Sequence, residues 1–228
     1  FPLRKDRYKG VGGTSIVDFF FTTEMVFLDT PGRWVSEGTD ESSKKSWQEL
    51  VHLLQRYRGQ RPIDGVMVVV PANFLLSESE QTLQDDAARI REVLDLMQQE
   101  LHFRFPVYLL VSKCDLVEGF VDFFRNLMAQ KRPEVFGWSN AAPEQGEPRQ
   151  VVATAFRGLC ARLDRLRLEM LVRVGRTRQA RRLFMFIEEF KRLQEPLATF
   201  ADEPFYADPV KDAPLFRGFY FTSGTQGE

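Results

Sequence analysis

Two short polar segments of this chain carry residues whose type and spacing suit the binding of a nucleotide with Mg²⁺. Residues 29–32 read DTPG and fit the DxxG pattern, in which an aspartate at a strand end reaches Mg²⁺ through water and the glycine N–H lies near the γ-phosphate. Asp29 is therefore a candidate metal ligand, and Gly32 a candidate nucleotide contact. The alternative is an ordinary turn, because Asp-x-Pro-Gly is also common turn chemistry.

A second segment, SKCD at residues 112–115, resembles the [NT]KxD element that recognises guanine. In that element the aspartate accepts two hydrogen bonds from the guanine edge and the lysine stem packs on the base. Lys113 and Asp115 are the corresponding candidate residues. Ser112 departs from the Asn or Thr of the pattern, which leaves the choice between GTP and ATP open. A solvated pair of charges at a strand end is the alternative interpretation.

Two further residues fall where GTPases of the Ras type place ligand contacts. Thr14 precedes the first predicted strand, in the position of the switch I threonine that binds Mg²⁺. Ser223 follows the last predicted strand, where a third loop contacts the base. The order of the four elements along the chain supports the nucleotide interpretation more strongly than any single motif. Mg²⁺ with GTP or ATP is therefore the expected cofactor.

Two parts of such a domain are not found in the sequence. No GxxxxGK[ST] motif occurs, so no residue is expected to cradle the β-phosphate. The strand that leads into this loop is also missing, although it is the central strand of a Ras-type sheet. We predict that both lie just before Phe1, because a sheet without its central strand leaves two buried edges unpaired. Arg33 stands where these enzymes use a water-positioning glutamine, which argues against fast intrinsic hydrolysis.

The elements that position these residues follow from hydrophobic periodicity. Apolar runs at 14–22 and 25–28 flank a polar turn and predict an antiparallel hairpin. Unbroken apolar runs at 66–70 and 107–111 predict strands that are buried on both faces. A last strand is expected at 218–222, and loops at 35–43 and 139–150. Helical spacing of apolar residues marks 44–57, a helix from about 80 to 101 with a capping box at Ser77 and Glu80, 121–128, 151–174 and 179–193.

Strands that alternate with helices predict an α/β fold: a doubly wound, mostly parallel sheet of the P-loop GTPase type with one antiparallel hairpin. Ligands bind such sheets at the carboxyl ends of the strands, where DTPG, SKCD and the final TSGT all fall. The predicted organisation is an α/β core over 1–138, a helical extension over 139–214, and the last core strand with its base-contacting loop over 215–228.

Composition excludes several other classes of protein. A hydrophobic fraction of 43% with 21 phenylalanines argues against disorder, and a net charge of −1 gives no basis for binding nucleic acid. Two cysteines, Cys114 and Cys160, cannot form a disulfide framework and have no metal-type spacing, so reduced thiols in the cytosol are expected. No apolar run approaches the about 18 residues of a spanning helix. Because the chain begins at Phe1, we expect it to be part of a longer protein.

The long predicted helices carry a basic stretch. Residues 157–182 contain nine arginines and two acidic residues, Asp164 and Glu169. Such a stretch is typical of a solvated helix face, and it is also compatible with a docking surface. The length of the helical extension exceeds what a minimal GTPase needs, which motivates the docking hypothesis.

Several segments together resemble the cytoplasmic domain of the TssM/IcmF family. They are GVGGT at 10–14, DFFFT at 18–22, LDTPGRW at 28–34, YRGQRPIDGVMVVV at 57–70, FPVYLLVSKCDLVEGF at 105–120 and LFRGFYFTSGTQ at 215–226. The similarity runs nearly from end to end and is more specific than either nucleotide motif.

The resemblance implies an inner-membrane component of the bacterial type VI secretion system. The expected protein is anchored by transmembrane helices outside this segment, and this domain faces the cytoplasm. The implied partners are TssL and TssJ in the membrane complex, together with baseplate proteins. In this family a Walker A loop, when present, lies just upstream. The resemblance also assigns Thr14 to switch I, Asp29 and Gly32 to the Mg²⁺ and γ-phosphate element, and Lys113 and Asp115 to the base element.

Two functions then compete. In the first, nucleotide binding orders the loops near Thr14 and after Gly32, and hydrolysis releases them, so that the domain is a switch or motor for assembly. In the second, the domain is a catalytically inactive, GTPase-shaped scaffold that docks partners. The fold alone does not decide between them. An unrelated small GTPase is disfavoured by the helical extension.

Overall fold

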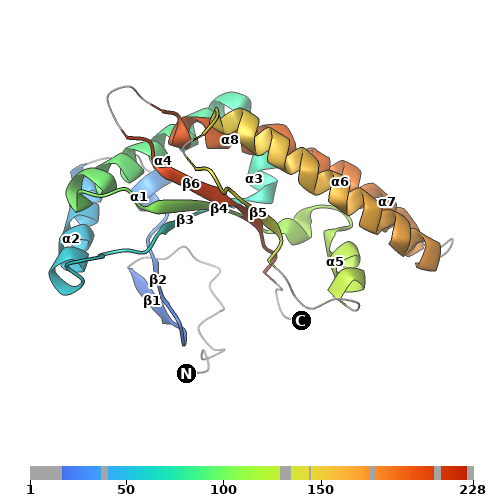
Figure 1. Ribbon diagram of the computed structural model, residues 1–228, viewed down its shortest axis with the longest axis horizontal. Helices are drawn as coiled ribbons and strands as arrows, with labels where there is room; N and C mark the ends of the chain where they lie inside the picture. Colours follow the sequence, from blue (N-terminus) through green and yellow to red (C-terminus); the bar gives the residue numbers. More distant parts are fainter. Residues whose placement is uncertain are drawn as a thin grey trace. The chain divides into compact units, whose positions relative to one another are not determined.

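The computed structural model describes most of the chain and divides it into two compact units. The described residues are 17–36, 41–128, 135–143, 145–174, 178–207 and 212–224. The first unit comprises Phe1–Pro62 and Glu92–His102, and the second comprises Ile63–Arg91 and Phe103–Glu228. Figure 1 labels the helices and strands of both units, which are considered separately below.

The first unit contains the predicted antiparallel hairpin. Strands β1 (Asp18–Phe21) and β2 (Val26–Asp29) pair with Phe19 opposite Leu28. Thr22 closes the turn, because its N–H donates to the Met25 carbonyl at 2.9 Å and its hydroxyl donates to the same oxygen. The hairpin prediction is therefore confirmed, and β2 ends at the first residue of the DTPG segment.

The segment after the hairpin is helical earlier than expected. A short helix α1 (Arg33–Ser36) follows Gly32 directly and overlaps the start of the loop predicted at 35–43. It is held by the Trp34 ring, which meets the Trp47 ring edge-on at 5.3 Å. Trp47 belongs to α2 (Glu41–Tyr57), which also contacts the last turns of α4 (Glu80–Leu101). There Gln55 donates to the Glu100 carbonyl at 2.6 Å.

The second unit is built on a mixed four-stranded sheet with the order β3-β4-β6-β5. Strands β3 (Val66–Pro71), β4 (Pro106–Ser112) and β6 (Leu215–Phe221) are parallel, and β5 (Gly137–Ser139) runs antiparallel to β6. The α/β class with a largely parallel sheet is confirmed. Strand β5 was not predicted, because three residues are too short to show alternation.

One face of this sheet is covered by the long helices. Helix α6 (Pro148–Val174), α7 (Arg178–Lys191) and α8 (Gln194–Phe205) pack together as a layer, drawn above the sheet in Figure 1. Phenylalanines fill the space between them and β6: the Phe156 ring lies 5.0 Å from that of Phe190, which lies 4.8 Å from that of Phe221. Aromatic burial of this kind supplies a large part of the core.

The remaining elements of the second unit lie around the sheet. They are α3 (Ala72–Ser77), the first turns of α4, the 3₁₀ turn η2 (Cys114–Leu116) and α5 (Phe120–Met128). Helix α8 was missed by the sequence prediction, because Pro196 and Pro204 both lie within it. The capping prediction at Ser77 was also wrong: Ser77 ends α3, and the hydroxyl of Ser79 accepts from the Thr82 N–H at 3.2 Å.

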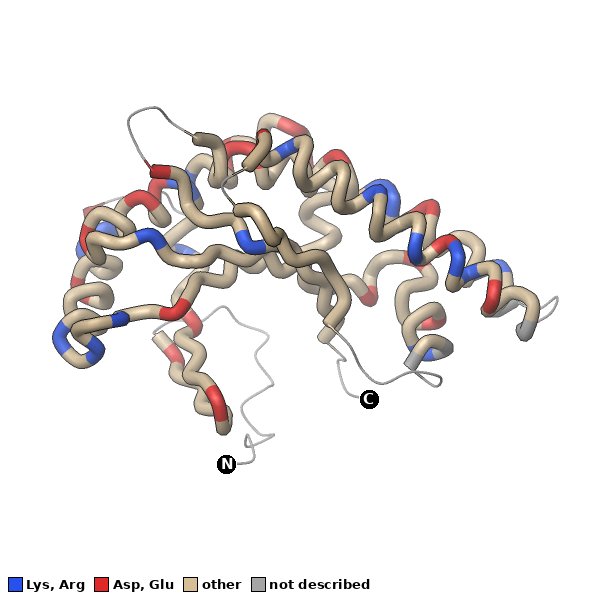
Figure 2. The backbone as a smooth tube through the Cα atoms, viewed as in Figure 1, with Lys and Arg blue, Asp and Glu red and all other residues tan. Residues whose placement is uncertain are grey.

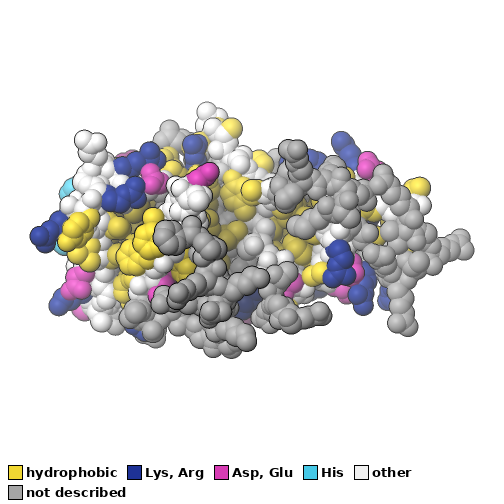
Figure 3. Space-filling view, turned by 90° about the horizontal axis from the view of Figure 1, so that it is seen from below, with side chains coloured by type: hydrophobic (Ala, Val, Ile, Leu, Met, Phe, Trp, Pro, Cys, Tyr) yellow, Lys and Arg dark blue, Asp and Glu magenta, His cyan; other side chains and the backbone are white. Residues whose placement is uncertain are grey.

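The prediction that β3 is buried on both faces is wrong for the described residues. The register places Met67 and Val69 on the same face as Tyr108 and Leu110. The exposed fractions of Met67 and Val69 are 47% and 56%. Figure 3 views the molecule from below and shows hydrophobic side chains at the surface. The described helices of this unit cover only the other face, which explains the difference.

Candidate functional site

The carboxyl ends of β4 and β6 bring two of the predicted nucleotide elements together. The Thr222 N–H donates to the Val111 carbonyl at 2.8 Å, and the Cys114 N–H donates to the Thr222 carbonyl at 3.1 Å. These bonds join the SKCD turn to the start of the TSGT segment. Lys113, Asp115 and Ser223 therefore lie at the same edge of the sheet, where ligands of parallel sheets bind.

The backbone at Lys113 turns the chain sharply out of β4. Lys113 has φ 55° and ψ 35°, the left-handed conformation. This conformation costs a non-glycine residue about 1–2 kcal/mol. It starts the 3₁₀ turn η2, in which the Leu116 N–H donates to the Lys113 carbonyl at 3.1 Å. The side chain of Lys113 is exposed, so its aliphatic stem is accessible to a planar ligand such as a base.

Cys114 anchors this turn from inside. Its side chain is fully buried, and its thiol donates to the Val111 carbonyl at 3.3 Å. Burial raises the pKa of Cys114 to about 12, and the Thr222 N–H offsets that rise only in part. A thiol that stays neutral at physiological pH is a poor nucleophile. Burial of Cys114 and its hydrogen bond to Val111 therefore hold the loop in place.

Asp115 and Ser223 are the polar groups next to this anchor. Both side chains are half-buried. Within the described ranges, the Asp115 carboxylate takes part in no hydrogen bond or ion pair. A carboxylate can accept hydrogen bonds on both oxygens, which is the chemistry needed to bind two adjacent N–H donors of a base.

Asp29 and Gly32 belong to the first unit. Asp29 ends β2, is exposed, and lies directly opposite Asp18 in the hairpin register. Carboxylate oxygens are the kind of ligand that Mg²⁺ takes in proteins, so the chemistry of Asp29 suits the predicted role. Gly32 is exposed, has no positive φ, and has open space where a Cβ would lie. Neither the local backbone conformation nor crowding requires a glycine there, which weakens the interpretation as a turn alone.

The candidate residues thus fall into two sets, one in each unit. Asp29 and Gly32 form the set proposed for Mg²⁺ and phosphate, and Lys113, Asp115 and Ser223 form the set proposed for the base. The third metal candidate, Thr14, lies outside the described residues.

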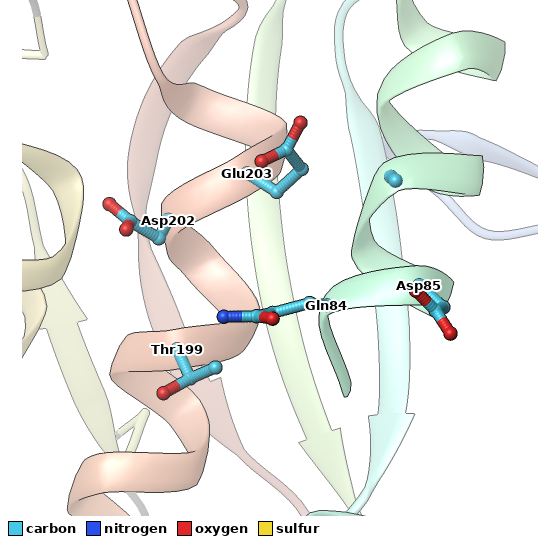
Figure 4. Close-up of a pocket in the computed structure, with 6 residues that line it drawn as sticks. Gln84, Asp85, Thr199, Asp202 and Glu203 are labelled. Carbon is cyan, nitrogen blue, oxygen red and sulfur yellow. The ribbon is translucent and has the colours of Figure 1, made fainter. Parts of the chain in front are cut away.

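A hollow that the sequence did not predict lies between α4 and α8. It has a volume of about 370 Å³ and is lined by Gln84, Asp85, Ala88, Thr199, Asp202 and Glu203. Figure 4 shows Glu203 extending from α8 towards α4, and Asp202 extending away from it. The carboxylates therefore do not converge. In the part of the chain that the structure describes, no group of three or more His, Cys, Asp or Glu residues is placed to hold a metal ion.

Comparison with known proteins identifies relatives of this chain. Residues 40–228 match the family model described as "IcmF-related N-terminal domain". The chain is 36% identical over 223 residues to "Type VI secretion system component TssM1" of Pseudomonas aeruginosa. This alignment covers 96% of the chain and 20% of the relative, so the chain spans one fifth of that protein's length. No solved structure matches the chain significantly.

Among the described residues, none of the helices combines the length and the apolar character that crossing a membrane demands.

Proposed function

The chain belongs to the TssM/IcmF family, and from this premise we propose that it is an NTPase-like domain of a type VI secretion membrane-complex protein. In this proposal the domain acts in assembly of the secretion apparatus. It lies at the cytoplasmic face of the bacterial inner membrane and is anchored through segments outside this chain. Its proposed partners are TssL, TssJ and baseplate proteins, and it binds no nucleic acid.

The nucleotide part of this proposal rests on one observation. Backbone hydrogen bonds join the turn at 113–115 to Thr222 at the carboxyl ends of two adjacent parallel strands. A crevice at this edge of an α/β sheet is where a base is expected. The exposed stem of Lys113 and the carboxylate of Asp115 would hold the base, and Ser223 would contact it from the second strand.

Strand connectivity supports the same proposal. An antiparallel pair comes first in the chain, and the parallel strands β3, β4 and β6 follow. A Ras-type sheet has this sequence of strands, with one further strand that precedes the pair in the chain. The loop after that strand would bind the phosphates, and Asp29 with Thr14 would hold Mg²⁺. Nucleotide binding would then order the segments around Thr14 and after Gly32.

The test is a Mg²⁺-dependent titration of fluorescent GTP and ATP analogues onto the full-length protein. We expect micromolar binding that is lost in Asp29→Ala. If the base is guanine, we expect a preference for GTP that is lost in Asp115→Ala, by about 10-fold or more. Asp85→Ala, an exposed aspartate on α4, is the matched control and should bind as the parent does. Absence of binding at millimolar nucleotide would contradict the switch and leave a GTPase-shaped scaffold.

The scaffold function is the second candidate, and the helical layer favours it. Helices α6 and α7 carry large apolar side chains at the surface: the exposed fractions are 62% for Leu168, 86% for Val172 and 52% for Phe184. Exposed apolar side chains that are close together mark protein interaction surfaces more often than isolated ones do. A docking role does not require nucleotide hydrolysis, so both functions can belong to one domain.

A further inference from the structure

Helix α6 has an outer face that no described element covers. Its inner face is buried, with Val152, Phe156, Leu163 and Met170 each at most 3% exposed. The opposite face carries exposed residues at alternating steps of four and three, a spacing that places them on one line along a helix. We call this line the outer stripe; its members are Thr154, Gly158, Ala161, Arg165, Leu168 and Val172.

The outer stripe combines open space with apolar surface. A Cβ added at Gly158 would meet no atom within 4 Å, and Ala161 is exposed one turn later. Small residues such as these let another backbone approach closely. Leu168 and Val172 follow on the same line and are largely exposed. A partner helix that packs along α6 could therefore approach closely near Gly158 and make apolar contacts near Val172.

The charges on and beside the outer stripe are mainly positive, and the described residues of this unit do not neutralise them. Arg157 donates to the Thr154 hydroxyl at 3.1 Å, and Arg162 donates to the Gly158 carbonyl at 3.4 Å. Within the described ranges, neither of them nor Arg165 is in an ion pair. Glu169 is the acidic residue on this side of the helix. Figure 2 shows the Lys and Arg positions along α6 and α7.

Arginines elsewhere in the same layer behave differently. Arg167, on the inner side of α6, lies 2.7 Å from the Asp164 carboxylate and 4.9 Å above the Phe184 ring. Arg182 of α7 lies 3.2 Å from Asp122. Arg167 and Arg182, which face other elements, are therefore paired with carboxylates. Within the described residues, the arginines on and beside the outer stripe have no acidic partner. An acidic partner would therefore gain charge complementarity on this face.

We propose that the outer stripe of α6 binds an amphipathic helix of a partner protein, whose apolar residues are flanked by Asp and Glu. Its apolar side chains would pack on Leu168 and Val172 and over Gly158, as two helices pack side by side. Its carboxylates would meet Arg157, Arg162 and Arg165. This inference rests on the docking role proposed above and is independent of nucleotide binding.

A second copy of this chain fits the face poorly. In an antiparallel pair of α6 helices the middle of the stripe would face itself, which brings Arg162 and Arg165 of both copies together. Like charges across an interface cost several kcal/mol. The charge pattern therefore selects a different, acidic protein over self-association.

The proposal is tested by site-specific photo-crosslinking in the full-length protein, in cells that secrete. The photo-reactive residue p-benzoylphenylalanine replaces Ala161, and Arg125 on α5, which is also exposed, is the matched control position. Mass spectrometry then reads the sequence of the cross-linked segment. We expect a segment of another protein with apolar residues at steps of three and four and with net negative charge.

Variants on the same face make the test specific. Val172→Glu, and separately the pair Arg162→Glu with Arg165→Glu, should lower the crosslink yield about tenfold, whereas Arg125→Glu should not change it. All four positions are exposed, so the variants should unfold at the same urea concentration as the parent.

Any of four results would overturn the proposal: a crosslink to α6 of another copy, a crosslink to lipid, a basic or non-helical segment, or no yield above that at Arg125. Nucleotide titration of the same variants is a separate readout. It should be unchanged, so failure of this inference is distinguishable from failure of the nucleotide proposal.

Discussion

The two faces of the sheet in the second unit are made of the same kinds of residue and have very different surroundings. On the face beneath α6, α7 and α8, Val107, Leu109 and Val111 of β4 are 0% exposed. On the other face Met67 and Val69 of β3 are about half exposed. Both strands read as unbroken apolar runs, a pattern typical of parallel strands that are covered on both faces. The difference shows that burial is decided by the layer that packs on a strand.

We call the face of the sheet that carries Met67 and Val69 the open face. Its exposed apolar side chains bear on what covers this face in the complete protein. Exposed valine and methionine side chains on the face of a sheet are costly, since each buried apolar Å² is worth about 25 cal/mol. Strand β3 also has one edge that no described strand pairs with. The exposed Phe19, Phe21 and Phe27 of the β1–β2 hairpin repeat this feature in the first unit. We propose that further elements, outside the described residues, pack on the open face of the sheet in the second unit.

The largest expected effect separates the two faces directly. Leu109→Ala removes a fully buried side chain from the covered face and should lower the free energy of unfolding by about 2–5 kcal/mol. Val69→Ala on the open face of this chain should cost less than about 1 kcal/mol. Urea unfolding of the two variants measures both values. Equal losses would show that the two faces do not differ as described.

A second prediction concerns the strand next to β4. Gly218 of β6 has φ +140°, beside the irregularity in the β4–β6 register, and an added Cβ would collide with the Trp138 carbonyl. Gly218→Ala should therefore destabilise the protein by about 1–3 kcal/mol. Gly158→Ala on the outer stripe is the control, because open space and helix propensity favour alanine there. A neutral Gly218→Ala would contradict the pairing of β5 with β6.

A third prediction concerns the pH dependence of stability that the buried thiols cause. Burial raises the pKa of Cys114 to about 12 and that of Cys160 to about 11, from an ordinary value of 9.0. A raised pKa in the folded state means that stability is complete below the unfolded pKa and is lost as pH rises above it. Urea midpoints should therefore fall between about pH 9 and pH 11. Cys114→Ala and Cys160→Ala should each flatten part of that fall, and an unchanged slope would contradict burial of the thiols.

Periodicity in the sequence was sufficient to predict the elements that position the base set. The structure contains strands at both predicted apolar runs, 66–70 and 107–111. It also contains the helix predicted at 121–128 and the long helix α6. The side chain of Thr22 closes the hairpin turn. That the SKCD and TSGT segments meet follows from parallel strands that end at the same edge. The predictions of single elements succeeded because each depends on residues close together in the sequence.

The parts that were missed depend on tertiary packing or on short signals. Strand β5 has three residues, and its pairing with β6 is a long-range contact. Helix α8 contains Pro196 in its first turn, where a missing N–H is tolerated, and its end is held by Arg91, which donates to the Tyr206 carbonyl at 2.8 Å. The open face of β3 was missed because an apolar run does not reveal which neighbour covers it.

The central claim, that the open face is an internal surface of a larger domain, is tested most directly by thiol labelling of the full-length protein. Val69→Cys places a thiol on the open face, and Val135→Cys, at a position that is 81% exposed, is the control. The native Cys114 and Cys160 are buried and should react slowly. If further elements cover the open face, Val69→Cys should react at least about tenfold more slowly than Val135→Cys. Equal labelling rates would contradict the claim, because they would show that the sheet of the complete protein presents this face to solvent.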